Sequence, residues 1–309
     1  MQRINILSVN TSEKKGVPKQ AVSQIVLTHN GIEADAHAGS WHRQVSLLAM
    51  ESVQKFEEQC GKKFAFGDFA ENITTQGFLL YTAKPGDRLR CGEVELEVTQ
   101  IGKKCHGTSC AVFHHTGACV MPKEGIFSRV LHGGALQAGD ELEYIPKTYK
   151  IDVITLSTRA SEGIYADLSG PEVARLLEHF CTERGWSCNI ERHVIPDDAA
   201  ILKSLLERLI LQKSDFVFTT GGTGISPTDI TPETVKPLLQ REIPGIMENI
   251  RQKYGTTNPA ALLSRSVAGQ SGDSLIFTLP GSVKAVQEYL AEICKNLEHL
   301  VYMRMGLGH

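Results

Sequence analysis

Only glycines and threonines make up the stretch Thr219-Thr220-Gly221-Gly222-Thr223-Gly224. Glycines let a backbone approach a ligand closely, and consecutive free N–H groups form a concavity that suits an anion. The threonine hydroxyls add neutral donors. A tight turn between a strand and a helix has the same composition, so the stretch predicts a phosphate-binding loop only if other groups support it.

Carboxylates supply that support. Asp229 follows the loop closely, and Asp197 with Asp198 follows another apolar segment. A carboxylate beside a phosphate is repulsive unless a cation lies between them, and Mg²⁺ accepts carboxylate and phosphate oxygens together. We therefore expect a magnesium-assisted phosphate site. Helix capping is the alternative role for Asp229, ahead of Thr231, and for one member of the Asp197–Asp198 pair.

The common nucleotide-binding signatures do not account for this loop. No Gly-x-x-x-x-Gly-Lys-[Ser/Thr] sequence occurs, and Pro227 stands where a dinucleotide fingerprint would have its third glycine. The residues alone therefore predict a phosphate site of neither the Walker nor the Rossmann type.

A second reactive group stands in the first half of the chain. Cys105 has Lys103, Lys104 and His106 as close neighbours. Nearby positive charge favours the thiolate, which is the nucleophilic form of cysteine. The alternative is a small buried side chain at the end of a strand, since cysteine is among the most buried residue types.

Metal binding is a third interpretation of the same segment. Thiolate and imidazole groups together suit Zn²⁺, but the spacing contains no paired Cys-x-x-Cys knuckle. Cys110 and Cys119 are two further thiols of this segment. The clustered residues are Cys105, His106, Cys110, His114, His115 and Cys119.

The loop and its carboxylates need a sheet edge to position them. After residue 150, strands alternate with helices, which predicts a mainly parallel sheet covered on both faces, with ligands bound at the carboxyl ends of the strands. Helices are expected from Gly170 to Gly185, after an Asp198 cap, and after a Ser282 cap. The expected strands are residues 151–157, 189–195, 215–220 and 274–280.

The first half is Gly-rich and predicts a mostly β, barrel-like domain. VELEVTQI (residues 94–101) alternates as a half-buried strand does, and Lys84-Pro85-Gly86-Asp87 is typical of a turn. One helix is expected near Leu47 to Gln59. With a boundary in Ile145 to Lys150, the chain divides into residues 1–147 and residues 151–309.

Composition limits the classes of function. The chain has 309 residues and a formal net charge of -3, which gives no electrostatic reason to expect nucleic acid as a partner. No apolar run approaches the ~18 residues that span a membrane, and the first residues do not resemble an export signal. We expect a cytoplasmic enzyme with no membrane partner, whose eight cysteines are largely reduced.

The second half resembles the MogA-type molybdopterin adenylyltransferases, which implies an α/β three-layer fold and transfer of an adenylyl group from Mg-ATP to molybdopterin. The matching motifs cover most of the domain in the right order. They are LSTRASEGIYADLSGP (Leu156 to Pro171), VIPDD (Val194 to Asp198), TTGGTGISPTDITPE (Thr219 to Glu233), LLSRSVAG (Leu262 to Gly269) and LPGSVKAV (Leu279 to Val286).

That resemblance implies roles for individual residues. Asp197 and Asp229 would be the catalytic carboxylates that organise Mg²⁺. The family commonly has Asp where this chain has Thr158, which puts any metal or nucleotide contact from that position in doubt. The substrate- or nucleotide-binding residues would be Ser157, Arg159, Thr219, Thr220, Gly221, Gly222, Thr223, Gly224, Gly281 and Ser282.

The first half resembles a MOSC domain, which implies a β-rich fold that carries, delivers or cleaves sulfur on a molybdenum cofactor. Cys105 occupies the family's characteristic cysteine position, so the resemblance implies a persulfide there. The matching segments are GIEADAHAG (Gly31 to Gly39), GDFAENITTQG (Gly67 to Gly77), KPGDRLRCGEVELEVTQIGKKCH (Lys84 to His106) and LQAGDELE (Leu136 to Glu143).

Together the two resemblances predict a two-domain enzyme of molybdenum cofactor biosynthesis, with ATP and molybdopterin as substrates. A protein that only binds or carries molybdopterin or a molybdenum or tungsten cofactor is the alternative. The expected partners are a metal-insertion enzyme and a sulfur donor. The resemblance also implies a homo-oligomer, since the adenylyltransferases typically form trimers.

Overall fold

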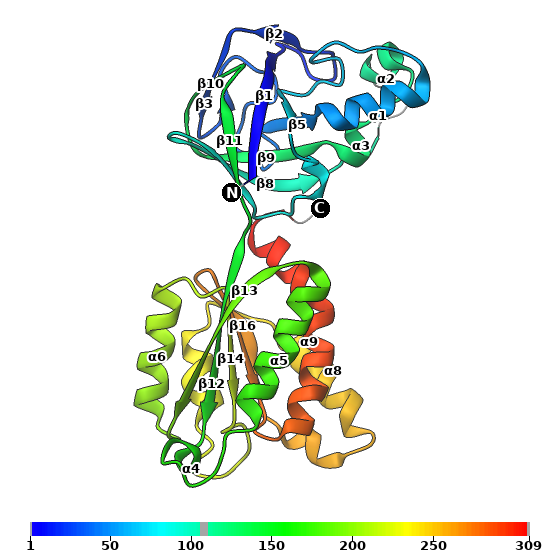
Figure 1. The fold of residues 1–309 in the computed structure, drawn as a ribbon. Coiled ribbons are helices and arrows are strands. Elements are labelled where there is room, and N and C mark those ends of the chain that lie inside the picture. The colour runs from blue at the N-terminus through cyan, green and yellow to red at the C-terminus, as the bar shows by residue number, and fades with distance from the viewer. Residues whose placement is uncertain (1, 106–110, 308–309) are drawn as a thin grey trace. The chain divides into compact units, whose positions relative to one another are not determined.

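The computed structural model describes residues 2–105 and 111–307, which fall into two compact units. One unit runs to Lys147 and includes the chain from Met305 onward; the other is Thr148–Arg304. Each has its own sheet and its own buried core (Figure 1).

The first unit is a closed barrel, as the sequence predicts. Seven strands follow one another in the order β11-β7-β8-β9-β5-β6-β1, and β11 pairs with β1 to close the ring, while β2 continues past β1. A second sheet has the order β10-β3-β4. The strands are β1 Gln2–Thr11, β2 Gln20–Val22, β3 Gln24–Thr28, β4 Gly31–Ile32, β5 Val45–Ala49, β6 Ile73–Gln76, β7 Arg88–Cys91, β8 Val94–Ile101, β9 Ile126–His132, β10 Gly134–Gln137 and β11 Glu141–Ile145.

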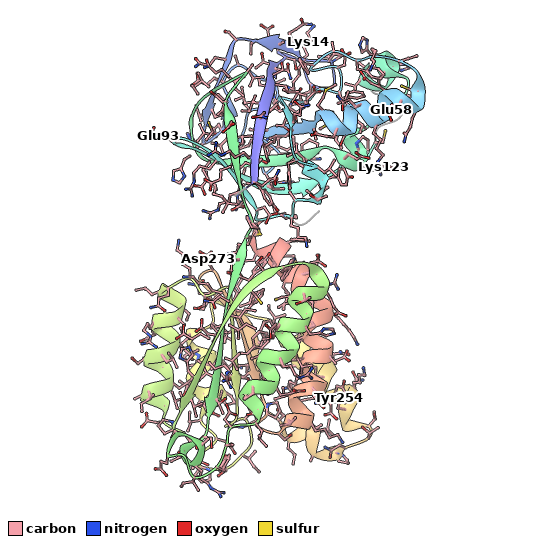
Figure 2. The ribbon with its side chains drawn as sticks, in the orientation of Figure 1. Lys14, Glu58, Glu93, Lys123, Tyr254 and Asp273 are labelled. Atoms are coloured by element: carbon pink, nitrogen blue, oxygen red, sulfur yellow. The ribbon has the colours of Figure 1, made fainter. Side chains whose placement is uncertain are left out.

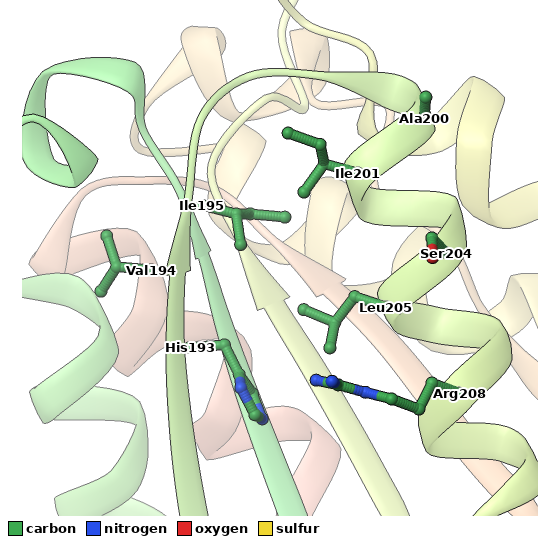
Figure 3. Close-up of a pocket in the computed structure, with 8 residues that line it drawn as sticks. All are labelled: His193, Val194, Ile195, Ala200, Ile201, Ser204, Leu205 and Arg208. Carbon is green, nitrogen blue, oxygen red and sulfur yellow. The ribbon is translucent and has the colours of Figure 1, made fainter.

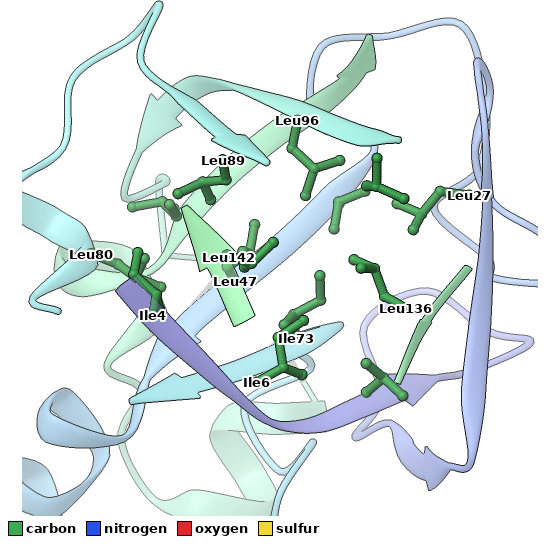
Figure 4. Close-up of a cluster of buried hydrophobic side chains, with 14 of the residues drawn as sticks. Ile4, Ile6, Leu27, Leu47, Ile73, Leu80, Leu89, Leu96, Leu136 and Leu142 are labelled. Atoms are coloured by element: carbon green, nitrogen blue, oxygen red, sulfur yellow. The ribbon is translucent and has the colours of Figure 1, made fainter. Parts of the chain in front are cut away.

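Aliphatic side chains fill the barrel (Figure 4). Leu47, Leu89 and Leu96, from three different strands, are completely buried there. β8 matches the predicted strand, yet it is not half-exposed: the carboxylates on its other face are covered too. Arg88 forms an ion pair with Glu95, and Arg129 forms one with Glu97, each at 2.7 Å. These pairs cover the face of β8 that the alternating pattern assigned to solvent.

The helices of this unit lie outside the barrel. The predicted helix begins later than expected, at Met50, because Leu47–Ala49 belong to β5, which pairs with β6 and β9. It ends at Gly61, whose φ of 68° is left-handed. The helical segments are α1 Met50–Cys60, η1 Leu80–Thr82, α2 Ala111–Thr116 and α3 Met121–Glu124.

The second unit is the predicted three-layer α/β domain. Its sheet has the order β13-β12-β14-β17-β16-β15, parallel from β13 to β17, with β16 antiparallel to both of its neighbours. Helix α6 covers one face, and α5, α8 and α9 cover the other (Figure 1). The strands are β12 Thr148–Leu156, β13 Ser187–Ile195, β14 Phe216–Thr220, β15 Arg241–Glu242, β16 Ala268–Ser271 and β17 Ser274–Leu279.

The ends of its helices follow the sequence signals. Asp198 caps α6 by accepting from the N–H groups of Ala200 and Ile201, and Gly185 ends α5 with a left-handed φ of 59°. The helical segments are α4 Thr158–Ser161, α5 Ser169–Arg184, α6 Ala199–Leu211, α7 Thr231–Val235, η3 Lys236–Leu238, α8 Pro244–Gly255, η4 Pro259–Leu263 and α9 Val283–Arg304.

Charged side chains lie on the outer surface of each unit. Lys14, Glu58 and Glu93 are exposed on the first unit, and Asp273 is exposed on the second (Figure 2). Within the described ranges, no helix combines the length and the apolar character that a membrane span requires.

Candidate functional site

A cavity of about 490 Å³ opens in the second unit where β12, β14 and β17 end. Six of the residues predicted to bind substrate or to catalyse line it: Ser157, Arg159, Asp197, Thr220, Gly281 and Ser282. The other lining residues are Thr155, Leu156, Ala160, Tyr165, Ala166, Asp167, Leu168, Ser169 and Val283.

Two long helices begin at this cavity. Ser169 opens α5 and Val283 opens α9, and both residues belong to the wall. Ser282 caps α9 by accepting from the N–H of Ala285 at 3.3 Å. A helix N-terminus carries a partial positive charge and unpaired N–H groups, so two of them facing one hollow favour a polyanionic ligand.

Asp197 is held in the wall by Thr158. Its Oδ2 accepts hydrogen bonds from the Thr158 N–H at 2.8 Å and from the Thr158 hydroxyl at 2.9 Å. The N–H of Asp197 donates in return to Thr158 Oγ1 at 3.0 Å. Thr158 therefore orients a carboxylate of the cavity.

The glycine-rich loop offers a run of unused donors. In the part of the chain that the structure describes, the N–H groups of residues 222–225 have no hydrogen-bond partner. Gly221 and Gly222 have φ values of 102° and 63°, and a Cβ on Gly221 would lie 2.4 Å from the carbonyl oxygen of Leu156. The glycines thus permit a tight passage beside β12 and leave consecutive amides available for an anion.

The two threonine hydroxyls before the loop differ in their surroundings. Thr219 is completely buried, and its Oγ1 lacks a partner among the described residues. Thr220 lines the cavity but donates its hydroxyl to the carbonyl oxygen of Pro280 at 2.9 Å. Both residues still belong to β14, whose pleat directs their side chains to opposite faces of the sheet.

Asp229 is not among the residues that line the cavity. Its Oδ2 accepts the N–H of Ser226 at 2.7 Å, and a Cβ on Gly224 would lie 2.8 Å from the same oxygen. The carboxylate thus closes the loop. It does not cap α7, because the N-cap residue there is Ile230.

Arg265, which the sequence did not single out, contacts this loop from a distant position in the chain. Its Nε donates to the carbonyl oxygen of Gly224 at 2.6 Å and its Nη2 to that of Asp229 at 2.8 Å. Nη1 forms an ion pair with Glu233. The guanidinium fastens both ends of the Gly224–Asp229 segment from a position far along the chain, which spacing cannot predict.

Asp167 is a second residue that the sequence did not single out. It accepts from the N–H of Gly170 at 3.0 Å and from the Thr155 hydroxyl at 2.8 Å, which joins the start of α5 to β12. Asp167 lies two residues before Ser169, the first residue of α5, where an Asp side chain can accept a free N–H of the first turn. The Arg159 guanidinium lies 5.0 Å from the ring centre of Tyr165, and both residues line the same cavity.

The donor set fits a magnesium ion. Mg²⁺ keeps several waters and is bound through one or two carboxylates together with substrate phosphates. Asp197 offers Oδ1, since both of its hydrogen bonds from Thr158 reach Oδ2. The cavity thus combines a carboxylate, two helix N-termini and the cation of Arg159, while residues 221–224 of the glycine-rich loop are not among those that line it.

A second hollow of this unit, about 590 Å³, lies between β13 and α6 (Figure 3). Val194, Ile195, Ile201 and Leu205 make most of its wall apolar, with His193 and Arg208 at one end. None of the predicted site residues lines it. It therefore carries none of the chemistry expected of the phosphate site.

In the first unit, Cys105 is exposed, which excludes the buried structural role considered from the sequence. His106 and Cys110 lie outside the described residues. Among those described, the side chains of Cys105, His114, His115 and Cys119 do not come together around a shared metal position. His115 instead contacts Asp68 at 3.2 Å.

Comparison with known proteins gives a family to each unit. Residues 152–299 match the model described as "Probable molybdopterin binding domain", and residues 34–143 match that of the MOSC domain. A molybdopterin adenylyltransferase of Helicobacter pylori is 34% identical over 161 residues, which cover 52% of this chain and 90% of the relative. The Escherichia coli molybdopterin adenylyltransferase is 36% identical over 144 residues, covering 46% and 72%.

Two further matches also cover about half of this chain. Gephyrin of Dictyostelium discoideum is 37% identical over 156 residues, which cover 49% of this chain and only 22% of gephyrin. A crystal structure of the tungsten cofactor synthesizing protein MoaB from Pyrococcus furiosus aligns with a TM-score of 0.46 at 34% identity, covering 52% of this chain and 98% of that one.

Proposed function

We propose a function for this chain on the premise that it belongs, through residues 152–299, to the family of the molybdopterin adenylyltransferases. The second unit adenylylates molybdopterin with Mg-ATP. The terminal phosphate oxygen of molybdopterin attacks the α-phosphorus of ATP, the bond to the bridging oxygen breaks, and pyrophosphate leaves.

One observation carries the proposal most directly. Asp197 stands in the wall of a cavity that also has two helix N-termini, in the same unit as four unpaired amides in residues 222–225. Transfer of a phosphoryl-type group depends mainly on positioning and on neutralising charge, so few acid–base residues are needed. A bound Mg²⁺ would neutralise phosphate charge, and Asp197 is the residue we assign to hold it.

The remaining residues have positioning roles in this proposal. The amides of the loop bind phosphate oxygens, and the helix N-termini at Ser169 and Ser282 bind further oxygens of the two substrates. Arg159 and the Tyr165 ring, 5.0 Å apart, form a cationic and aromatic wall for a planar ring system. Asp229 supplies a second negative charge, and Arg265 keeps its loop closed.

The test is a pyrophosphate-release assay of the whole chain with molybdopterin and Mg-ATP. We expect Asp197→Asn to lower the rate at least a hundredfold. Asp198→Asn is the matched control, because its neighbouring carboxylate caps α6 and does not line the cavity. A wild-type chain that binds molybdopterin yet releases no pyrophosphate would establish the carrier function instead.

For the first unit we propose a role in handling sulfur or the molybdenum or tungsten cofactor, as expected of a MOSC domain. The exposed thiol of Cys105 takes a sulfur atom from a persulfide donor, which leaves as a thiol, and becomes a persulfide. Mass spectrometry of the chain after treatment with a persulfide donor tests this: one added sulfur is expected, and none in Cys105→Ser.

Each proposed activity requires a partner protein. We propose that a metal-insertion enzyme consumes the adenylylated product and that a sulfur donor supplies Cys105. We further propose that the protein acts in the cytoplasm as a homo-oligomer, a trimer by its resemblance to the adenylyltransferases. Size measurement by light scattering tests the trimer.

A further inference from the structure

Two carboxylates and one imidazole form a group on the sheet of the second unit. Asp152 lies on β12, and Glu191 and His193 lie on the neighbouring strand β13. One donor atom from each of these three side chains lies within 4.8 Å of the other two. None of the three residues lines the cavity that we assign to the nucleotide, so the proposed function does not use them.

The register of the two parallel strands brings these side chains together. Asp152 is paired with Glu191, and Ile154 is paired with His193. Because successive side chains point to opposite faces of a sheet, Asp152, Glu191 and His193 share the face on which Ile154 packs against the leucines of α6. Asp152 and His193 are 41 positions apart in the chain, so only strand pairing makes them neighbours.

The carboxylate of Asp152 is buried and already ordered. Its Oδ1 lies 2.7 Å from His193 Nε2, and its Oδ2 accepts the hydroxyl of Ser214. Only 7% of the Asp152 side chain and 14% of the His193 side chain are exposed. In metal sites, hydrogen bonds from outside the coordination sphere hold the ligating carboxylates in position. Ser214 is placed to do this for Asp152.

Glu191 adds a second negative charge beside Asp152. Its side chain is exposed, and its carboxylate has no ion pair or hydrogen bond within the ranges that the structure describes. Two carboxylates on directly paired residues of adjacent strands repel each other. A divalent cation between them would replace that repulsion with two attractive interactions.

The types of donor atom select the kind of ion. Mg²⁺ and Ca²⁺ prefer oxygen ligands alone, whereas imidazole nitrogen suits transition metals and zinc. Zn²⁺ binds His nitrogen and carboxylate oxygen at about 2.1 Å, so two of its ligands lie at most about 4.2 Å apart. Donors within 4.8 Å therefore need only a small adjustment, which the exposed Glu191 side chain can make.

His193 places the group beside the hollow between β13 and α6 (Figure 3). Three protein donors leave further coordination positions, which water can fill from the hollow. Arg208 enters the same hollow from α6, and among the described residues it forms no ion pair with either carboxylate. Its positive charge opposes a bare cation, but the two carboxylates offset the charge of a divalent one.

We propose that Asp152, Glu191 and His193 bind one divalent transition-metal ion, for which Zn²⁺ is the best fit. The site joins β12 to β13 and is separate from the Mg²⁺ position that we assign to Asp197. Metal binding here therefore requires neither ATP nor molybdopterin.

Titration of the metal-free, reduced whole chain with CoCl₂ tests the site, because the visible spectrum of bound Co²⁺ separates oxygen and nitrogen ligands from thiolates. We expect a component that lacks a thiolate-to-cobalt charge-transfer band, saturates at one Co²⁺ per chain and is displaced by ZnCl₂. His193→Gln and Glu191→Gln should each weaken this component by roughly tenfold or more. Glu191 is exposed, so its variant keeps the test valid if His193→Gln does not fold.

Matched controls come from the same unit. His179→Gln and Glu207→Gln remove the same groups from α5 and α6, where both side chains are more than half exposed, and should bind Co²⁺ as the wild type does. Arg208→Gln should bind at least as tightly, because it removes a positive charge from the hollow. Absence of a component without thiolate ligands, or equal affinity in wild type, His193→Gln and Glu191→Gln, overturns the proposal.

Discussion

At the scale of single residues, charge and hydrogen bonding decide what the candidate site can do. The carboxylates of Asp197 and Asp198 are neighbours in the chain but have different tasks, because one lines the cavity and the other caps α6. Asp229 differs again, since its carboxylate closes the loop through Ser226. Substitution of each aspartate therefore tests a different role.

Two substitutions at Asp229 distinguish charge from shape. Asp229→Asn keeps an oxygen that accepts the Ser226 N–H but removes the negative charge, whereas Asp229→Ala removes both. We expect both variants to lose pyrophosphate release at least a hundredfold, because the proposed function uses Asp229 as its second negative charge. Activity of Asp229→Asn within threefold of wild type would restrict Asp229 to holding the loop.

The cysteines should differ in reactivity. Burial raises the pKa of the Cys294 thiol to about 12, and burial together with a hydrogen bond to Cys188 raises that of Cys181 further. Both stay protonated, and hence unreactive, across pH 7–9, whereas Cys60 and Cys105 are exposed. Brief treatment with iodoacetamide at pH 8, followed by peptide mass spectrometry, should label Cys60 and Cys105 well before Cys181 and Cys294. Equal labelling in the folded protein would contradict this assignment.

At the scale of elements, the ends of helices and strands position the site. α5 and α9 begin at the cavity. A shift of either helix would therefore move its positively charged N-terminus relative to the cavity. Arg304 ends α9, and it donates to the carboxylate of Asp215 at 2.9 Å with both side chains less than a tenth exposed. The same guanidinium bonds the backbone of Asp273, so it fixes α9 to two strand ends.

Removing Arg304 should destabilise the second unit. Breaking a buried ion pair leaves an uncompensated charge and costs about 3–5 kcal/mol. Arg304→Ala should therefore lower the free energy of unfolding of this unit by about 3 kcal/mol in urea denaturation. Lys203→Ala is the control, because its pair with Glu207 is more than half exposed on both sides and contributes ~0.5 kcal/mol or less. Similar losses in the two variants would show that the Arg304 pair is not structural.

At the scale of the whole molecule, each unit has a separate core. Leu96 is completely buried in the barrel, and Leu206 is completely buried between α6 and the sheet of the second unit. A compact unit with its own core unfolds as a cooperative unit. The protein should therefore show two transitions in differential scanning calorimetry.

A matched pair of core variants tests the separation. Leu96→Ala and Leu206→Ala each remove the same buried side chain, at a cost of about 2–5 kcal/mol. Each should shift one transition to lower temperature and leave the other within 1 °C (roughly the resolution expected where one core does not affect the other). A single transition would mean that the chain unfolds as one cooperative unit, and a common shift of two transitions would mean that the stabilities of the two units are coupled.

Local patterns in the sequence predicted much of this protein. The apolar strands, the Asp198 cap, the Gly185 helix end and the glycine loop each depend on neighbours a few residues away, and all appear where expected. The alternation of strands and helices was sufficient to predict the mainly parallel sheet of the second unit. Such signals work because capping, turns and periodic burial act over one or two helical turns or a few strand residues.

Tertiary structure decided the rest, since those contacts join distant parts of the chain. Barrel closure pairs Gln2 with Tyr144, Thr158 orients Asp197 across 39 positions, and Arg265 fastens a loop 36 to 41 positions earlier. The burial of Glu95 and Glu97 on β8 likewise depends on arginines of neighbouring strands. Spacing along a sequence does not determine which side chains meet across a sheet, because that depends on strand order and register.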